Sequence, residues 1–127
     1  MLLDASAVLA YFRKETGADR VREALLSDAT MSTVNFAEVV TRYVREGADE
    51  DAVGRLRDRL MVRMLPLDAA MALEAGRLTN ATRQFGLSLG DRCCLATAKL
   101  AGYPVLTADR VWRDVGPLIG VDVHLIR

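Results

Sequence analysis

Four acidic side chains occupy positions where chemistry is expected in an alternating strand–helix chain. Asp4 and Asp109 end predicted strands, Glu38 lies one turn into a helix, and Asp91 opens a helix. A set of hard oxygen ligands without histidine or cysteine suits Mg²⁺ or Mn²⁺. Such ions activate water and stabilise the leaving oxygen in phosphodiester cleavage. If the four carboxylates converge, the sequence predicts metal-assisted hydrolysis.

Other catalytic systems find little support. The one histidine, His124, stands alone in a terminal strand and is interpreted as structural. Gly86 and Gly90 do not match the spacing of a dinucleotide-binding or phosphate-binding loop. The adjacent cysteines Cys93 and Cys94 have no third partner, so we interpret them as free, buried thiols of a reducing compartment rather than as metal ligands.

Each of the four carboxylates also has a structural explanation as a helix cap. The segments "SLGD" (88–91) and "NFAE" (35–38) both match the capping-box template. Asp4 and Asp109 are placed to cap the helices that follow them. Position alone does not decide between a cap and a metal ligand.

Helical geometry favours a functional role for Asp91. The predicted apolar stripe of its helix consists of Leu89, Cys93, Ala96 and Leu100. Asp91 lies opposite this stripe, yet its own neighbours at helical spacing are Cys94, Leu95 and Ala98. An ionised carboxylate in such surroundings is expensive to desolvate unless it is paired or bound to a metal.

The same geometry favours an ordinary structural role for Glu38. The apolar arc of its helix consists of Phe36, Val39, Val40, Tyr43 and Val44. Glu38 shares the polar face with Arg42 and Arg45, so an ordinary Glu38–Arg42 surface pair explains it well, and spacing alone does not single it out.

The elements that must position these residues alternate along the chain. Strands are predicted over 1–5, 29–34, 62–67, 103–109 and 121–126. Helices are predicted over 6–14, 16–26, 35–47, 49–61, 68–82 and 88–102, with a short helical turn near 112. This alternation predicts a parallel sheet between layers of helices, with any ligand beyond the carboxyl ends of the strands.

Length and composition place the chain among single-domain globular proteins. Its 127 residues suffice for one domain, 1–127, and 51% of them are hydrophobic. The 17 basic and 17 acidic residues argue against a nucleic-acid interface built on net positive charge. No apolar run has the roughly 18 residues of a membrane span, and the N-terminus lacks the basic leader of a signal peptide. We therefore expect a cytoplasmic protein without membrane contact.

Four segments, in this order and spacing, carry a family resemblance: "MLLDASAVLAYF", "STVNFAEVV", "LSLGDRCCLATA" and "GYPVLTADRVW". Together they resemble the PIN-domain family, and within it the VapC-type toxins of type II toxin–antitoxin pairs. The resemblance spans the whole chain and implies a three-layer α/β/α sandwich with a central parallel sheet. It implies a catalytic and metal-binding quartet, Asp4, Glu38, Asp91 and Asp109, supported by Ser6, Asn35 and Thr107. The fourth position is the least uniform in the family, and Asp114 is a nearby substitute for Asp109.

The resemblance also implies an activity and partners. The expected activity is that of a Mg²⁺- or Mn²⁺-dependent endoribonuclease toxin that hydrolyses RNA with a metal-activated water. The expected assembly is a homodimer neutralised by a cognate VapB-type antitoxin, with DNA bound only through the antitoxin. Candidate contacts to RNA phosphates are Arg13, Lys14, Arg110 and Arg113. The helices around 21–26 and 39–44 would either face a partner or pack in the core. Two alternatives stay open: a PIN-domain ribonuclease of housekeeping RNA processing, and a non-catalytic binding module with this fold.

Overall fold

Five short strands form one parallel sheet at the centre of the computed structural model, which describes all 127 residues. The strands are β1 (Leu2–Leu3), β2 (Thr30–Ser32), β3 (Arg63–Leu65), β4 (Val105–Thr107) and β5 (Val123–Leu125). Their order across the sheet is β3-β2-β1-β4-β5, and every pairing is parallel. Helices connect consecutive strands, so the predicted alternation of strands and helices is confirmed. Parallel neighbours need such crossover connections.

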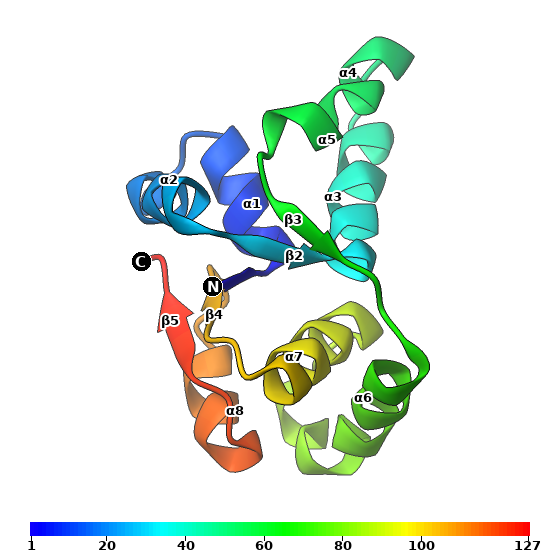
Figure 1. Cartoon of the computed structure of the whole chain (residues 1–127), viewed down its shortest axis with the longest axis vertical. Coiled ribbons are helices and arrows are strands. Elements are labelled where there is room, and N and C mark those ends of the chain that lie inside the picture. The colour runs from blue at the N-terminus through cyan, green and yellow to red at the C-terminus, as the bar shows by residue number, and fades with distance from the viewer.

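Helices cover both faces of this sheet (Figure 1). They are α1 (Ala5–Phe12), α2 (Ala18–Ser27), α3 (Thr33–Arg45), α4 (Glu50–Gly54), α5 (Leu56–Arg59), α6 (Ala69–Ala81), α7 (Leu89–Ala101) and α8 (Trp112–Ile119), with one 3₁₀ turn, η1 (Arg83–Phe85). None of them is both long enough and apolar enough to cross a bilayer.

The core is divided between the two faces because consecutive strand residues point in opposite directions. Leu2 and Val105 belong to a cluster with residues of α6, α7 and α8. Leu3 and Leu106, the next residue in each strand, belong to a second cluster with residues of α1, α2 and α3. The predicted three-layer α/β/α sandwich is therefore confirmed.

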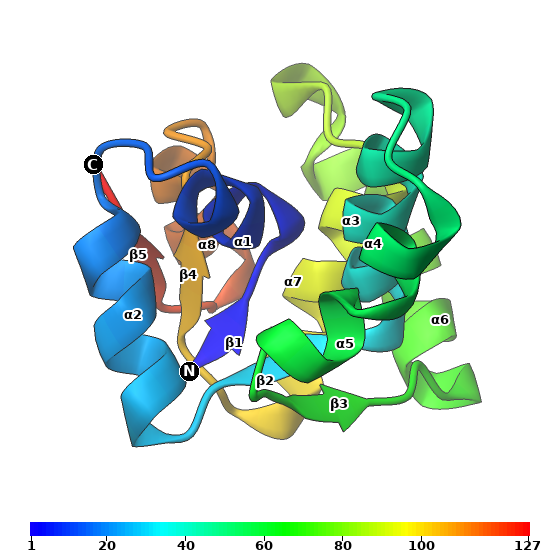
Figure 2. The same cartoon turned by 90° about the horizontal axis from the view of Figure 1, so that it is seen from above.

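The chain changes direction across the sheet between β1 and β4. It first adds β2 and then β3 on one side of β1, and later returns to place β4 and β5 on the other side. β1 and β4 consequently run side by side, with Leu2 opposite Val105 and Leu3 opposite Leu106 (Figure 2). In open α/β sheets such a switch point leaves a crevice at the carboxyl ends of the strands, where ligands bind.

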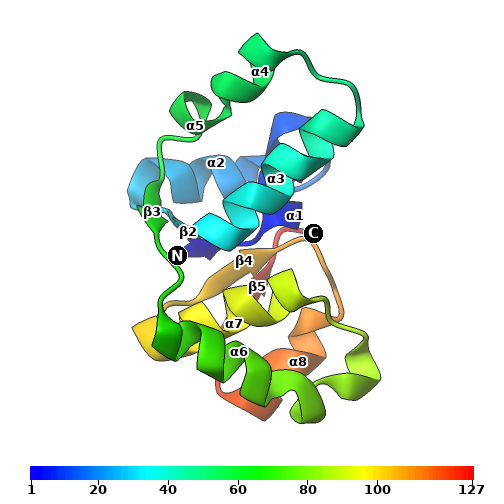
Figure 3. The ribbon, with the colours of Figure 1, turned by 90° about the vertical axis from the view of Figure 1, so that its right-hand side faces the viewer.

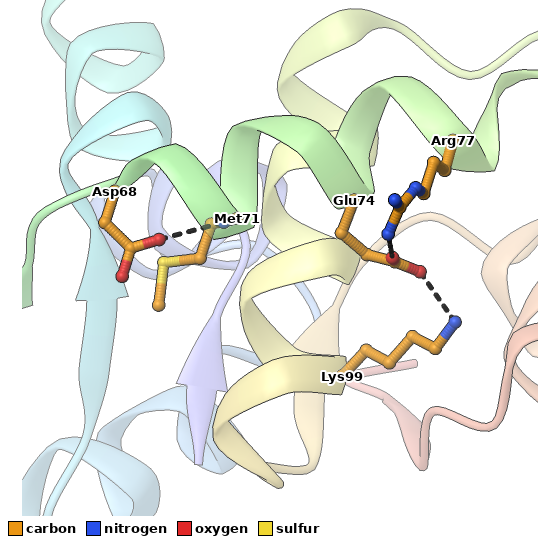
Figure 4. A network of polar contacts seen from close by, with 5 residues as sticks. All are labelled: Asp68, Met71, Glu74, Arg77 and Lys99. Atoms are coloured by element: carbon orange, nitrogen blue, oxygen red, sulfur yellow. Dashed lines mark hydrogen bonds and ion pairs between the residues drawn. The ribbon is translucent and has the colours of Figure 1, made fainter.

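Helix α7 is held between the sheet and α6 (Figure 3). Lys99 on α7 forms an ion pair of 2.6 Å with Glu74 on α6, and Arg77 approaches the same carboxylate at 4.0 Å (Figure 4). Asp68 caps the start of α6 by accepting a hydrogen bond of 2.8 Å from the backbone of Met71. Lys99 of α7 thus faces α6, and this ion pair helps to hold the helix that carries Asp91.

The structure corrects three predicted helix boundaries. The helix predicted over 35–47 begins at Thr33, because Ser32 accepts a hydrogen bond from Val34 and acts as the N-cap. The helix predicted over 49–61 is divided at Arg55 into α4 and α5, directly after Gly54, a weak helix former. The helix predicted over 6–14 ends at Phe12, and Lys14 adopts a φ of 55° that is incompatible with a right-handed helix.

Candidate functional site

The structure brings the four predicted acidic residues together around one pocket of about 200 Å³. Asp4 follows β1, Glu38 lies on α3, Asp91 lies in the first turn of α7, and Asp109 follows β4. The pocket therefore opens at the carboxyl ends of β1 and β4, where the chain changes direction across the sheet.

Asp4 is the most rigidly held of the four. It is 3% exposed and caps α1. Its Oδ2 accepts hydrogen bonds from the Ser6 backbone at 3.3 Å, from Ser6 Oγ at 2.5 Å and from Thr107 Oγ1 at 2.9 Å. Burial raises the pKa of Asp4, these hydrogen bonds oppose the increase, and the charge of Asp91 adds to it. Ser6 and Thr107, two of the supporting residues that the family resemblance implies, thus both donate hydrogen bonds to Asp4.

Glu38 has a different partner from the one its helical spacing suggested. Asn35 lies inside α3, fully buried, and its Nδ2 donates a hydrogen bond of 2.7 Å to Oε2 of Glu38. The expected surface pair with Arg42 is wrong, and so is the capping box over 35–38, because Ser32 begins the helix. Burial raises the pKa of Glu38, the bond from Asn35 opposes this, and the charges of Asp4 and Asp91 increase it further.

Asp91 belongs to the capping box at the start of α7 and also lines the acidic pocket. The predicted capping box is present: Asp91 N donates to Ser88 Oγ at 3.1 Å, and Ser88 N donates to Asp91 Oδ2 at 2.9 Å. Burial raises the pKa of Asp91, the bonds with Ser88 oppose this, and the charge of Asp109 adds to it. Its helical neighbours Cys94, Leu95 and Ala98 are buried in the core.

Part of the predicted apolar stripe on α7 is wrong. Leu89 and Leu100 are 62% and 49% exposed, whereas Cys93 and Ala96 are buried. The reason is length: a helix of 13 residues spans about 20 Å, about twice the reach of a three-residue strand at about 3.3 Å per residue, so its ends extend past the sheet.

Asp109, rather than Asp114, lines the pocket. Asp109 Oδ1 accepts a hydrogen bond of 3.0 Å from the backbone of Val111 in a turn before α8, and its own N–H donates to Thr107 Oγ1 at 3.1 Å. Asp114 lies on the exposed surface of α8, with its carboxylate 3.7 Å from Arg113.

The four carboxylates share one hydrogen-bonding pattern. In each, a single oxygen accepts every hydrogen bond that the protein donates: Asp4 Oδ2, Glu38 Oε2, Asp91 Oδ2 and Asp109 Oδ1. The second oxygen of each has no protein donor. A pocket with four such oxygens offers the donor set that a hard divalent cation prefers, although no three carboxylates already converge as a finished metal site. The residues present therefore fit Mg²⁺ or Mn²⁺ in chemistry.

Two residues of the site were missed as functional candidates. Arg42 is the one cation that lines the pocket; its position four residues after Glu38 was the available signal. Gly90 is buried against the Glu38 carboxylate, where an added Cβ would meet Oε1 at 2.0 Å. Its Cα faces α3 across the α3–α7 contact. The only signal in the sequence for a role of Gly90 was its position immediately before Asp91.

None of the remaining candidates lines the pocket. Cys93 and Cys94 are free and buried, and burial raises the pKa of both thiols, as expected for core residues. His124 is exposed and lies 2.9 Å from Asp122. Among the predicted phosphate contacts, Arg13 is ion-paired with Glu46.

Comparisons with known proteins identify relatives that match most of the chain. The family model described as PIN domain matches residues 1–117. A ribonuclease VapC of Mycolicibacterium smegmatis is 32% identical over 124 residues, covering 89% of this chain and 94% of that protein. Ribonuclease VapC42 of Mycobacterium tuberculosis is 31% identical over 117 residues, covering 84% and 88%. The solved structure of DNA-bound VapBC from Salmonella typhimurium has a similar fold, with a TM-score of 0.77 at 16% identity over 99% of this chain and 97% of that one.

Proposed function

The chain belongs to the PIN-domain family, and on that premise we propose that it is a divalent-metal-dependent endoribonuclease that acts as the toxin of a type II toxin–antitoxin pair. The observation that carries this proposal is the pocket in which four carboxylates from four separate elements each keep one oxygen free of protein donors. The relatives named VapC ribonucleases support the choice of RNA as substrate, since they match most of the chain at about a third identity.

The unbonded oxygens of Asp4, Asp91, Asp109 and Glu38 would hold Mg²⁺ or Mn²⁺. The cation, when bound, supplies the charge that makes water nucleophilic and stabilises the leaving oxygen of the phosphodiester. Asp4 and Asp91 suit this task because the hydrogen bonds that their Oδ2 atoms accept fix the orientation of each carboxylate.

Glu38 and Arg42 have roles of their own in the proposed reaction. The raised pKa of Glu38 suits its carboxylate to accept a proton from the attacking water. Arg42 is placed to contact a phosphate of the RNA, because its guanidinium carries the one positive charge among the residues that line the pocket.

The proposed partners follow from the charge of the pocket and from the relatives. Four carboxylates against one arginine leave an acidic pocket, which a basic side chain of a VapB-type antitoxin would neutralise. DNA would be bound through the antitoxin, since the chain itself has no net positive charge. The helices expected to face a partner bury Val21 and Val39 but leave Leu26 and Val44 exposed, so only their exposed sides are available to an antitoxin or to a second copy in a homodimer.

The test is RNA cleavage by the purified chain with Mg²⁺ or Mn²⁺, with EDTA, and by the variants Asp4→Asn and Asp91→Asn. Both variants should lose cleavage and growth arrest, whereas Asp114→Asn, an exposed aspartate outside the pocket, should retain both. Full cleavage by Asp4→Asn would reject the assignment. Growth arrest that co-expression of the neighbouring small open reading frame does not relieve would favour a housekeeping ribonuclease over a toxin.

A further inference from the structure

A second cavity, larger than the acidic pocket, lies at the other end of α1. Its volume is about 810 Å³. The first part of α1 lines the acidic pocket, and the last part, Tyr11 and Phe12, lines the second cavity. The two sites are therefore joined by one short helix.

This cavity concentrates positive charge in a chain of zero net charge. Lys14, Arg22 and Arg59 line it, and none of the three takes part in an ion pair. Of the two acidic residues in its lining, Glu15 is neutralised by Arg127 at 3.1 Å, which leaves Asp19. The cavity thus carries an excess of unpartnered cations, as an anion site requires.

Aromatic rings lie beside these cations. The guanidinium of Arg59 sits 4.5 Å from the centroid of the Phe12 ring, which holds it by a cation–π contact. The half-buried ring of Tyr11 lies 5.8 Å from that of Phe12. Positive charge combined with aromatic surface is the combination that binds single-stranded nucleic acid, through its phosphates and by stacking of its bases.

The loop that shapes the cavity is fixed in place before any ligand binds. Lys14 has a φ of 55°, a strained conformation that persists only when its surroundings enforce it. Gly17 packs on the end of the chain so closely that an added Cβ would meet the carbonyl oxygen of Ile126 at 2.4 Å. Arg127 donates a hydrogen bond of 2.9 Å to the carbonyl of Thr16. Little ordering of this loop would therefore be needed on binding.

We propose that this cavity binds a nucleotide of the RNA strand a few residues away from the cleaved bond, with Lys14, Arg22 and Arg59 contacting its phosphate and Tyr11 stacking on its base. Asp4 and Tyr11 are seven residues apart, which corresponds to about 10 Å along a helix. That distance equals the rise of about three stacked nucleotides at about 3.4 Å each. The inference rests on the proposed ribonuclease function and assigns to it a substrate-positioning site.

The experiment measures binding separately from cleavage. The full chain is titrated into fluorescently labelled single-stranded RNA of random sequence in EDTA, at several salt concentrations. The double variant Lys14→Gln/Arg22→Gln should weaken binding at least tenfold and reduce the slope of log K against log salt by about 0.7, the value for one lost phosphate contact. Arg59→Gln should act in the same direction. Arg57→Gln, on the same short helix and outside the cavity, is the matched control and should bind like the wild type.

The outcomes separate this inference from the proposed function. Unchanged RNA binding by the double variant and by Arg59→Gln, with RNA cleavage intact, would overturn the nucleotide site alone. Unchanged RNA binding together with weaker binding of the co-encoded antitoxin would also overturn it and assign the cavity to that protein. A wild-type chain that binds RNA through these cations yet cleaves none with Mg²⁺ or Mn²⁺ would support the site and reject the ribonuclease.

Discussion

The carboxylate of Glu38 rests directly against the backbone of Gly90, so close that a Cβ added at Gly90 would lie 2.0 Å from Oε1. This contact crosses from α3 to α7 and is reinforced by Asn35, whose Nδ2 donates both to Glu38 and, at 3.3 Å, to the carbonyl of Gly90. The residue before Asp91 thus sets the position of a second acidic side chain on another helix.

Gly90→Ala should therefore move Glu38 and reduce RNA cleavage by about tenfold to a hundredfold, because small displacements of reacting groups are costly. Stability should change little, since alanine is favoured over glycine in a helix by about 1 kcal/mol and offsets the contact. Gly76→Ala on α6, where an added Cβ meets nothing within 4 Å, is the control and should keep full activity. Cleavage rates and thermal melts check both. Unreduced cleavage by Gly90→Ala would mean that the position of Glu38 does not matter.

Thr107→Val removes a hydrogen bond that lowers the pKa of Asp4. The pKa of Asp4 should then rise, and because the ionised form is needed to hold a cation, activity should be lost at a higher pH as the solution is acidified. The acidic limb of the pH–rate profile should shift to higher pH. Thr97→Val is the matched control, since Thr97 is equally buried but donates to the carbonyl of Cys93. An acidic limb that stays in place in Thr107→Val would show that Asp4 does not control it.

Ser88→Ala separates the two roles of the first turn of α7, which caps the helix and places Asp91 in the acidic pocket. Ser88 accepts the hydrogen bond from Asp91 N, and loss of such a cap costs about 1 kcal/mol of stability. The backbone of residue 88 still donates to Asp91 Oδ2, so the carboxylate should stay in the pocket. We expect a lower denaturation midpoint with cleavage retained, the reverse of Asp91→Asn. Loss of cleavage in a well-folded Ser88→Ala would contradict this division.

The parts of the fold that could be predicted are those encoded within single segments. Alternating strands and helices required parallel pairing, and the capping box of Ser88 and Asp91 lies within four residues. The position of Asp4 at the end of a strand pointed correctly to the edge of the sheet where the pocket opens.

What could not be predicted depends on contacts between segments. The spacing within α3 predicts Arg42 as the partner of Glu38. The actual environment of Glu38 comes from the contact of α3 with α7, which buries Asn35 and Gly90, and the sequence of a single helix does not encode that contact. The exposure of Leu89 likewise depends on how far α7 extends past a short sheet.

The pKa of Asp91 is raised first by burial and then by the charge of Asp109, so ionisation of this carboxylate is less favourable in the folded chain than in the unfolded chain. The protonated carboxyl of Asp91 therefore stabilises the folded chain. This contribution is complete below the pKa that Asp91 has in the unfolded chain, and it is lost as pH rises through the higher pKa that Asp91 has in the folded chain. In EDTA, Asp91→Asn should therefore melt above the wild type at neutral pH, and the difference should shrink as pH falls. Asp114→Asn should follow the wild type. Thermal melts across pH measure this, and a constant difference would show that ionisation is not its cause.

Adding Mn²⁺ or Mg²⁺ should reverse that order of stability. A cation that binds only the folded chain adds about 2.7 kcal/mol at a hundred times its dissociation constant. It also offsets the burial and the smaller mutual repulsion that raise the pKa values of Asp4, Glu38 and Asp91. The melting temperature of the wild type and of Asp114→Asn should rise with the cation, while that of Asp91→Asn should rise much less. Because melting does not depend on cleavage, equal shifts in all three proteins would place the bound cation outside the acidic pocket.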